Sequence, residues 1–307
     1  MARLKRNISP RGFSRLSLGA LVALFTIVVT GALVRLTGSG LGCSDWPACN
    51  EERFVDVSTG HGAIEQVNRL FTGVVALAVI LAVLGSLRLA HRRPVLTWLS
   101  IGLVVGVLAQ VVIGGIVVLT GLNPFANMAH FLVSMVLLAN AMVLHRISQT
   151  EPGDWSTKRP SLHGAVVALA GTVSIVTGTV VTATGPHAGD EEAIRFGFDI
   201  SNVARIHSVS VMLTLCAITW MLWNTRSRSS ERARLEPKIA SLLGVALLQA
   251  LVGYVQYFSD VPAMLVAVHI AGASMVWLCI VDVLILDNVS DRRDAESSRS
   301  TPALSRR

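Results

Sequence analysis

Three histidines lie inside long apolar runs of the sequence: His130, His207 and His269. An ionisable side chain is costly inside a membrane span and is usually retained there for a function. Each of the three falls roughly one or two helical turns from the same end of its run. Two facing helices of a bundle can each supply one imidazole to a haem iron. The residues therefore predict haem ligation, and an interfacial polar role is the alternative for any single histidine.

An internal repeat relates these histidines. Two parts of the chain match with an offset of 139 residues, which pairs His130 with His269 and Asn68 with His207. The pair His207 and His269 predicts a bis-histidine site in the second half of the chain. The matching positions of the first half are His130 and Asn68. Since asparagine is not a normal axial haem ligand, the first site is expected to be five-coordinate, open or filled by another group.

Glu65 is the other costly residue, near the start of the second apolar run. It precedes Asn68 by three residues, so both lie on one face of a helix and the carboxylate is aimed at the first-half site. The alternative is a solvated charge at a helix N-terminus. The matching residue of the second half is Ala204, so we expect the first half to carry out chemistry and the second to hold a cofactor. Three arginines are expected at the same depth in the membrane as Glu65, where they would either pair with haem propionates or extend to lipid head groups: Arg35, Arg69 and Arg205.

The elements that position these residues are membrane helices. Hydrophobic residues make up 52% of the 307 residues and charged residues 15%, whereas a soluble domain has about 25% charged. Eight apolar runs are long enough for a hydrocarbon core, which takes about 20 helical residues. These runs are 16–37, 64–88, 95–119, 126–146, 162–184, 203–224, 239–258 and 262–286. The sequence predicts an all-α integral membrane protein with two repeated four-helix bundles, residues 16–147 and 162–287.

The distribution of charge predicts the orientation. Lysine and arginine gather in 1–15, 88–94, 146–160, 225–238 and beyond 287, and the remaining loops are acidic and poor in both. The positive-inside rule makes the basic segments cytoplasmic, so both termini are inside and the net charge of +7 implies no nucleic-acid partner. We expect a cytoplasmic N-terminal tail (1–15), a cytoplasmic linker (148–161) and a disordered cytoplasmic tail (288–307). The histidines and Glu65 then lie toward the extracytoplasmic side.

Cys43 and Cys49 lie six residues apart in the outer loop 38–63. That compartment permits a disulfide. Two free thiols and a metal pair are the alternatives, and the nearest loop histidine for a metal is His61. His61 and His187 are undecided, although His187 could line a pocket mouth. Three further histidines are expected to be interfacial residues at the cytoplasmic edge: His91, His145 and His163.

The sequence resembles the haem A synthases over all eight runs. The resemblance rests on Gly31…Val34-Arg-Leu-Thr-Gly-Ser-Gly-Leu…Cys43-Ser-Asp-Trp-Pro…Cys49, on Ile64-Glu65…Arg69-Leu70 and on Thr184-Gly-Pro-His-Ala-Gly-Asp190. It implies an oxidoreductase that converts the C8 methyl of haem O into a formyl group through hydroxylated intermediates, giving haem A for terminal oxidase assembly, with haem b as cofactor.

The resemblance also implies individual roles. His207 and His269 are the axial ligands of haem b, His130 binds the substrate haem, Glu65 is the catalytic acid or base, and Cys43 and Cys49 form a disulfide. It implies a multi-pass protein of the plasma membrane whose active site faces outward. Haem O synthase and terminal oxidase assembly factors are the expected partners, and an oligomer is compatible with the sequence.

One position departs from the pattern of that family, which has a histidine three residues after the glutamate where this chain has Asn68. Either His130 alone holds the substrate iron or His61 replaces the absent ligand, and the single ligand is favoured. A membrane cytochrome b that only transfers electrons would share the histidines but would not need Glu65 or the cysteine loop. A haem carrier should have broken helices at the membrane midplane, whereas the polar residues here lie near one edge.

Overall fold

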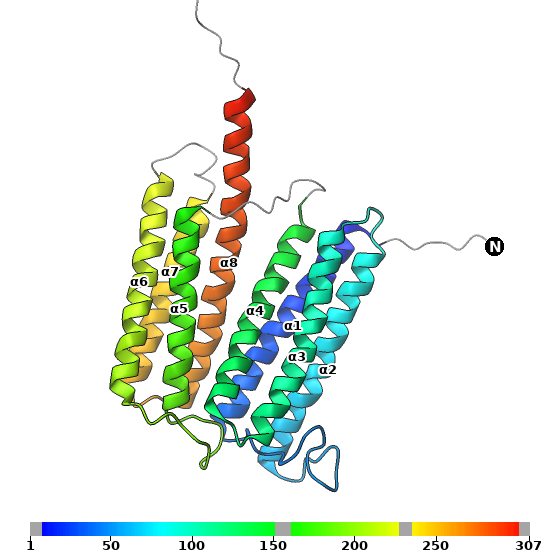
Figure 1. Ribbon diagram of the computed structural model, residues 1–307, viewed down its shortest axis with the longest axis vertical. Helices are drawn as coiled ribbons and strands as arrows, with labels where there is room; N and C mark the ends of the chain where they lie inside the picture. The colour runs from blue at the N-terminus through cyan, green and yellow to red at the C-terminus, as the bar shows by residue number, and fades with distance from the viewer. Residues whose placement is uncertain (1–7, 151–160, 227–234, 301–307) are drawn as a thin grey trace, which may run out of the picture.

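The computed structural model describes residues 8–150, 161–226 and 235–300, with side chains described up to 287. Within these residues the chain forms eight α-helices (Figure 1). They are α1 (Pro10–Leu36), α2 (Gly60–Leu87), α3 (Pro94–Leu119), α4 (Pro124–Ser148), α5 (Leu162–Thr184), α6 (Ile200–Arg226), α7 (Glu236–Phe258) and α8 (Ala263–Ser300). All eight are long and apolar enough to cross a membrane. The described chain therefore has the fold of an eight-span integral membrane protein, as the sequence predicts.

Local signals set where several helices begin. The Ser9 side chain accepts a hydrogen bond from the Gly12 amide, and Pro10 occupies the first helical position. Such a cap satisfies an amide that has no partner within the helix, and proline at this position loses no hydrogen bond. For this reason α1 begins at Pro10, six residues before the apolar run expected from 16, and takes in much of the expected N-terminal tail.

The other end of the chain differs from the prediction. Residues 288–300 were expected to be disordered, but α8 continues through them to Ser300. The segment is polar, yet it contains neither glycine nor proline until Pro302. Nothing in the local sequence therefore breaks a helix that the apolar part of α8 has already nucleated. Residues 301–307 of the expected tail, residues 151–160 of the expected linker and residues 1–7 lie outside the described part of the chain.

The helices form two groups of four that stand side by side, α1–α4 and α5–α8 (Figure 1). In the first group α1 packs on α2 and α4, and α3 packs on α2 and α4. In the second group α5 packs on α6 and α8, and α7 packs on α6 and α8. The neighbour pairs correspond one for one, as a repeated four-helix unit requires. The two groups meet through α1 and α4 on one side and α5 and α8 on the other.

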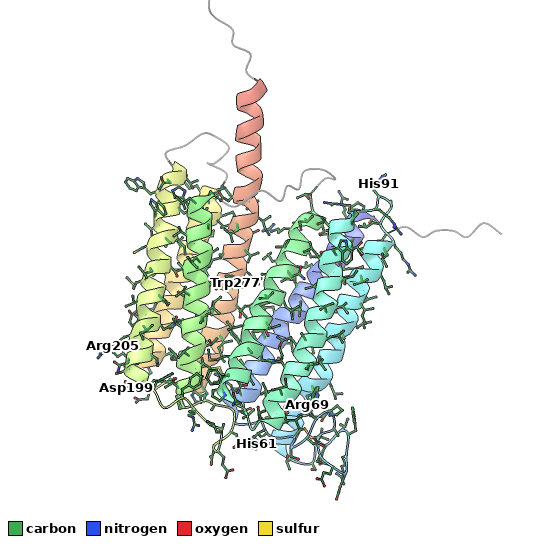
Figure 2. The ribbon with its side chains drawn as sticks, viewed as in Figure 1. His61, Arg69, His91, Asp199, Arg205 and Trp277 are labelled. Atoms are coloured by element: carbon green, nitrogen blue, oxygen red, sulfur yellow. A yellow bond between two sulfur atoms is a disulfide. The ribbon has the colours of Figure 1, made fainter. Side chains whose placement is uncertain are left out.

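Apolar packing fills each group, and polar contacts connect them. Leu103 and Leu138 are fully buried in the first group, and Ile239 and Leu242 are fully buried in the second. Many large apolar side chains point outward instead, as expected for helices whose outer faces meet lipid rather than water. Between the groups, the indole Nε1 of Trp277 donates to a backbone carbonyl of α4 at 2.8 Å (Figure 2).

The four connections expected on the outer side gather at one end of the bundle. His61, Arg69, Asp199 and Arg205 lie at that end, and His91 lies at the opposite end (Figure 2). We call it the loop end; it contains the segments 37–59, 120–123, 185–199 and 259–262. The structure therefore confirms that these loops share one end, and which compartment that end faces remains a prediction.

Candidate functional site

The second half brings the imidazoles of His207 on α6 and His269 on α8 close together, with their planes nearly perpendicular. Their ring centroids lie 6.4 Å apart and the ring planes are 84° from parallel. A metal–imidazole nitrogen bond is about 2.0 Å, and the ring centre lies ~1.1 Å beyond the nitrogen, so one ion between two imidazoles sets the centroids ~6.2 Å apart. The observed separation therefore leaves room for a single iron between the two rings.

The other nitrogen of each ring is already engaged. Nδ1 of His207 lies 3.1 Å from the hydroxyl of Thr177 on α5, and Nδ1 of His269 lies 2.8 Å from Nε2 of Gln249 on α7. The Gln249 amide also donates to the His269 carbonyl at 2.7 Å. A metal-binding histidine characteristically donates its second ring N–H to such a partner and keeps Nε2 for the metal, as His207 can do toward the Thr177 hydroxyl. At His269 the partner is an amide nitrogen, which is a donor, so the Gln249 amide would have to turn its oxygen toward Nδ1 for the same arrangement. With that turn, the two imidazoles fit a pair of axial ligands for one haem iron.

Two glycines allow the rings to lie against the neighbouring helices. A Cβ at Gly178 of α5 would lie 3.0 Å from Cε1 of His207, and a Cβ at Gly253 of α7 would lie 2.9 Å from Cε1 of His269. Both distances are shorter than an ordinary carbon–carbon contact of about 3.5–4.0 Å. A residue larger than glycine would therefore push either imidazole out of its present position.

The first half repeats this arrangement around His130 of α4. Gln110 of α3 donates to the His130 carbonyl at 2.9 Å, as Gln249 does to that of His269. A Cβ at Gly114 of α3 would lie 3.5 Å from Cε1 of His130. His130 therefore occupies in the first half the position that His269 occupies in the second.

Asn68 of α2 likewise occupies the position of His207. The Thr30 hydroxyl of α1 donates to Oδ1 of Asn68 at 2.8 Å. The adjacent Gly31 faces the Asn68 amide, and a Cβ at that glycine would lie 3.9 Å from Nδ2. Asn68 also lines an apolar cleft of about 420 Å³ between α1 and α2. The other residues that line the cleft are Thr30, Leu33, Val34, Ala63, Ile64, Val67 and Phe71.

The surroundings of His130 differ from those of His269 in one respect. The Gln110 amide Nε2 contacts the Ser134 hydroxyl at 2.5 Å instead of the imidazole. As a result, Nδ1 of His130 and Oε1 of Gln110 are both buried without a hydrogen-bond partner in the described part of the chain. One of these groups can donate and the other can accept, so they are chemically matched although they form no hydrogen bond with each other.

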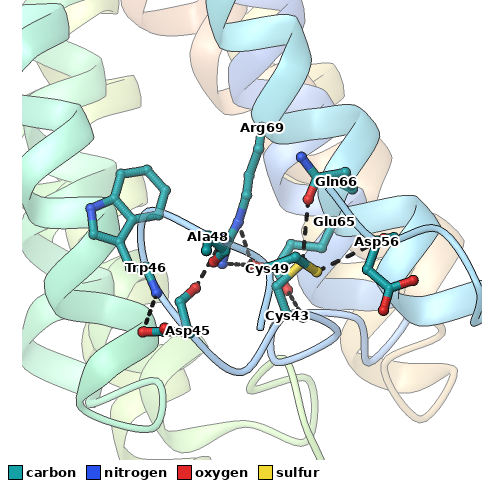
Figure 3. Close-up of polar contacts among 9 residues, drawn as sticks. All are labelled: Cys43, Asp45, Trp46, Ala48, Cys49, Asp56, Glu65, Gln66 and Arg69. Atoms are coloured by element: carbon teal, nitrogen blue, oxygen red, sulfur yellow. Dashed lines mark hydrogen bonds and ion pairs between the residues drawn. A yellow bond between two sulfur atoms is a disulfide. The ribbon is translucent and has the colours of Figure 1, made fainter. Parts of the chain in front are cut away.

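Glu65 is held at the loop end of α2 by three donors (Figure 3). Arg69, one turn further along the helix, donates to Oε1 through Nε at 3.0 Å and through Nη2 at 2.6 Å. The Cys43 amide donates to Oε2 at 2.7 Å. Glu65 is 5% exposed, and it is not among the residues that line the α1–α2 cleft. The carboxylate is thus a buried, ion-paired group beneath the cysteine loop.

The cysteine loop covers this ion pair. Cys43 and Cys49 form a disulfide, as predicted, which rules out free thiols and a metal pair. Nη1 of Arg69 donates at 3.1 Å to the carbonyls of Asp45 and Ala48 within the loop. The indole of Trp46 lies 5.1 Å from the Arg69 guanidinium carbon, within the range of a cation–π contact. The loop is therefore fastened to α2 through the same arginine that binds Glu65.

The three arginines expected near propionates have different surroundings. Arg69 donates to Glu65 and to the loop carbonyls, so a propionate would have to replace one of these bonds. Arg205 is exposed at the start of α6, close to Asp199 (Figure 2). The Arg35 side chain is half-buried against Gly189 and has no hydrogen-bond or ion-pair partner among the described residues. Of the three, Arg35 is the partly buried one whose donors have no partner among the described residues.

The two undecided histidines of the loop end have polar partners. Nδ1 of His61 lies 2.9 Å from the Ser39 hydroxyl, and Nε2 of His187 lies 2.8 Å from the Val261 carbonyl. Ser39 and Val261 belong to the loops that follow α1 and α7. His61, in the first turn of α2, therefore holds the loop 37–59, and His187 connects the loop 185–199 to the loop after α7. Within the described chain no group of three or more metal-binding side chains occurs.

The sequence analysis did not identify the residues around the imidazoles. A signal was available: Thr30 and Gly31 recur as Thr177 and Gly178, but with an offset of 147 rather than 139 residues. The loop 37–59 is eight residues longer than its counterpart 185–199, and this difference shifts the two offsets. Gln110 and Gln249 do follow the offset of 139, and only their function was missed.

Fold and site together define a class, namely an integral membrane protein of two four-helix units, the second of which brings two helix-borne imidazoles together. Residues 14–61 and 54–281 match the profile of the COX15-CtaA family, described as cytochrome oxidase assembly protein. Because the match extends over more than half of the sequence, the chain belongs to this family.

Individual relatives agree with the family. A haem A synthase of Geobacillus thermodenitrificans is 34% identical over 112 residues, which are 36% of this chain and 35% of the relative. One of Lysinibacillus sphaericus is 35% identical over 135 residues, 43% of each chain. One of Shouchella clausii is 25% identical over 243 residues, 72% of this chain and 79% of the relative. The more similar matches therefore cover less than half of those relatives, and the longer one covers about four fifths.

Proposed function

We propose that the protein is a haem A synthase that oxidises the C8 methyl of haem O to a formyl group through hydroxylated intermediates. Membership of the family and the names of the relatives support haem A biosynthesis. The observation that carries the proposal is the difference between two otherwise matching halves. Both have a pair of ligand positions, and only the first has a buried carboxylate, Glu65, at the loop end.

In this proposal His207 and His269 hold haem b, and His130 binds the iron of haem O as its only imidazole ligand. Haem b supplies a one-electron relay for the oxidation. Thr177 and Gln249 fix the orientation of the two haem b ligands through their Nδ1 atoms. Arg35 lies in the last turn of α1, at the loop end, and its donors have no partner among the described residues, which supports it as a propionate contact.

Glu65 is the proposed acid or base. The Arg69 guanidinium and the Cys43 amide hold its two carboxylate oxygens in place, so the group is positioned before substrate binds. The disulfide loop and the Trp46 indole cover it and keep bulk water away. A proton taken from the methyl group or from an attacking water would reside on one of the two oxygens.

Haem extraction tests this proposal. The protein and its Glu65→Gln variant are produced in cells that make haem O but lack the synthase, and the extracted haems are separated and identified. We expect haem A with the parent protein, and bound haem b without haem A with the variant. A normal yield of haem A from the variant would remove Glu65 from the mechanism.

The haem b assignment needs a separate variant. His207→Ala should remove the low-spin bis-imidazole spectrum, whereas Glu65→Gln should retain it. A bis-imidazole spectrum that survives in His207→Ala would contradict the ligand assignment. A parent protein that binds haem b but never yields a formyl haem would indicate a cytochrome that only transfers electrons.

The proposal includes a cellular setting. The basic segments support a multi-pass protein of the plasma membrane with the loop end on the extracytoplasmic side. The substrate would come from the enzyme that makes haem O, and the product would go to factors that assemble a terminal oxidase. Labelling of a cysteine introduced into the loop 185–199 in intact cells tests the orientation, because Cys43 and Cys49 are joined in a disulfide and a thiol on the cytoplasmic side would be protected from a reagent that does not cross the membrane.

A further inference from the structure

The first-half site differs from the second at a single ligand position. His207 and Asn68 have the same surroundings: a threonine hydroxyl one helix away bonds each side chain, and a glycine one residue after that threonine faces it. The frame that holds an imidazole in the second half is thus retained in the first half, with an amide in place of the ring. An amide is shorter than an imidazole and is not a normal iron ligand, so space is left where the second ligand would lie.

The Asn68 amide is oriented by its bond to Thr30. Because Oδ1 accepts from the Thr30 hydroxyl, the Nδ2 hydrogens are the part of the side chain left for another partner. In the described chain no acceptor lies within hydrogen-bond distance of Nδ2. The amide also lines the cleft of about 420 Å³, whose other lining residues are apolar except for Thr30. An oriented donor therefore faces a space without a competing acceptor.

We infer that the iron of the substrate haem has an exchangeable coordination position on the Asn68 side, which takes a small ligand that accepts a hydrogen bond from Nδ2 of Asn68. This inference rests on the proposed function, because it takes the substrate haem to be bound by His130. The class of ligand is set by the space and by the donor: one to three atoms, with a lone pair toward the amide. Water, cyanide and carbon monoxide belong to this class.

In this arrangement Asn68 is a positioning residue for the ligand, and Thr30 orients Asn68. In the proposed function the second-half haem would have no such position, since His207 and His269 would both hold it. The two sites therefore differ in a property that can be measured without following product formation.

The test uses the full chain, purified with bound haem O and haem b and quantified by haem extraction. After reduction, carbon monoxide should bind one of the two haems of the parent protein. In Asn68→His a second imidazole should replace the exchangeable ligand, so carbon monoxide binding should be lost and a second low-spin haem should appear. Carbon monoxide binding that persists unchanged in this variant would count against the inference.

Asn68→Leu tests the hydrogen bond, and it decides the question if Asn68→His does not accumulate in the membrane. This variant keeps the space but removes the donor. The ferric protein should therefore still bind cyanide, with an affinity about two- to tenfold lower than that of the parent protein. The matched control is Asn140→Leu, because Asn140 lies on α4 of the same half and donates to the Leu99 carbonyl. Cyanide affinity should be unchanged in the control. Equal affinities in Asn68→Leu and the parent protein would overturn the inference.

The outcomes separate this inference from the proposed function. Protein that carries haem O but binds no carbon monoxide overturns the inference alone. Protein that binds carbon monoxide at one haem but makes no haem A overturns the proposed activity alone. Protein that never carries haem O overturns both.

Discussion

If the second half holds haem b as proposed, Gly253→Ala should weaken haem binding there, although the substitution adds only one methyl group. The new Cβ would lie 2.9 Å from Cε1 and 3.5 Å from Nδ1 of His269. The preferred carbon–carbon separation is about 3.5–4.0 Å, so the ring must move by about 0.6–1.1 Å. Metal–ligand distances tolerate a change of only ~0.2 Å, so the imidazole cannot move that far and keep its bond to iron.

The size of the effect follows from the cost of overpacking. Adding a methyl group to a packed site costs about 1–3 kcal/mol. If the cost falls on the haem-bound state, haem affinity drops about 5- to 150-fold. The assay is the rate of haem transfer from the purified protein to an excess of apomyoglobin, followed by absorbance and compared with the parent protein.

Gly244→Ala is the matched control, because Gly244 lies on the same helix and a Cβ there would meet nothing within 4 Å. Alanine is also the better helix former, so this variant should fold at least as well as the parent protein. Equal haem retention in Gly253→Ala and Gly244→Ala would refute the reasoning, since the steric conflict would then have no consequence for the site.

Two further predictions concern other parts of the chain. Arg146→Ala should lower the melting temperature of the purified protein, because Asp282, buried at the junction of the two halves, would lose the guanidinium that binds it at 2.5 and 2.6 Å. Lys238→Ala should have a smaller effect, since Lys238 is half-exposed and 3.6 Å from the same carboxylate, and equal effects would contradict this ranking. In the loop after the disulfide, hydrogen bonds from Ser58 hold the pKa of Asp56 below its ordinary value. The hydrogen bonds from Ser58 should therefore persist at and above the ordinary pKa of an aspartate, and they should be lost as the pH falls through the lowered pKa of Asp56. The measurement is amide exchange of Ser58 compared with its intrinsic rate, and a loss of protection already at pH 5 would contradict the prediction.

The sequence was sufficient for the properties that depend on contiguous residues. Mean hydropathy over about 20 residues is a local quantity, and eight apolar runs correctly predicted eight helices. The ends were less accurate where a cap rather than hydropathy sets the boundary, as at Ser9. The helices of the two halves also have corresponding neighbours, which is compatible with the repeat seen in the sequence.

Part of the site was within reach of the sequence. The offset of 139 residues predicted that His207 and His269 form one pair and that Asn68 breaks the other, and the structure brings the first two rings together. The same offset did not identify Thr30 or Thr177, because the longer loop 37–59 changes the spacing between α1 and α2.

What only the tertiary structure decided is how each helix is rotated about its own axis and what the loops touch. The sequence placed Glu65 and Asn68 three residues apart on one helix face. In the fold, Glu65 binds Arg69 and the Cys43 amide, whereas Asn68 lies at the α1–α2 cleft. The fold also gives the three arginines at one depth different surroundings. Arg69 is paired, Arg205 is exposed, and Arg35 is half-buried without a partner among the described residues. The reason is that depth in the membrane follows from position along a single helix, whereas a side chain's partner depends on packing between helices and loops far apart in the chain.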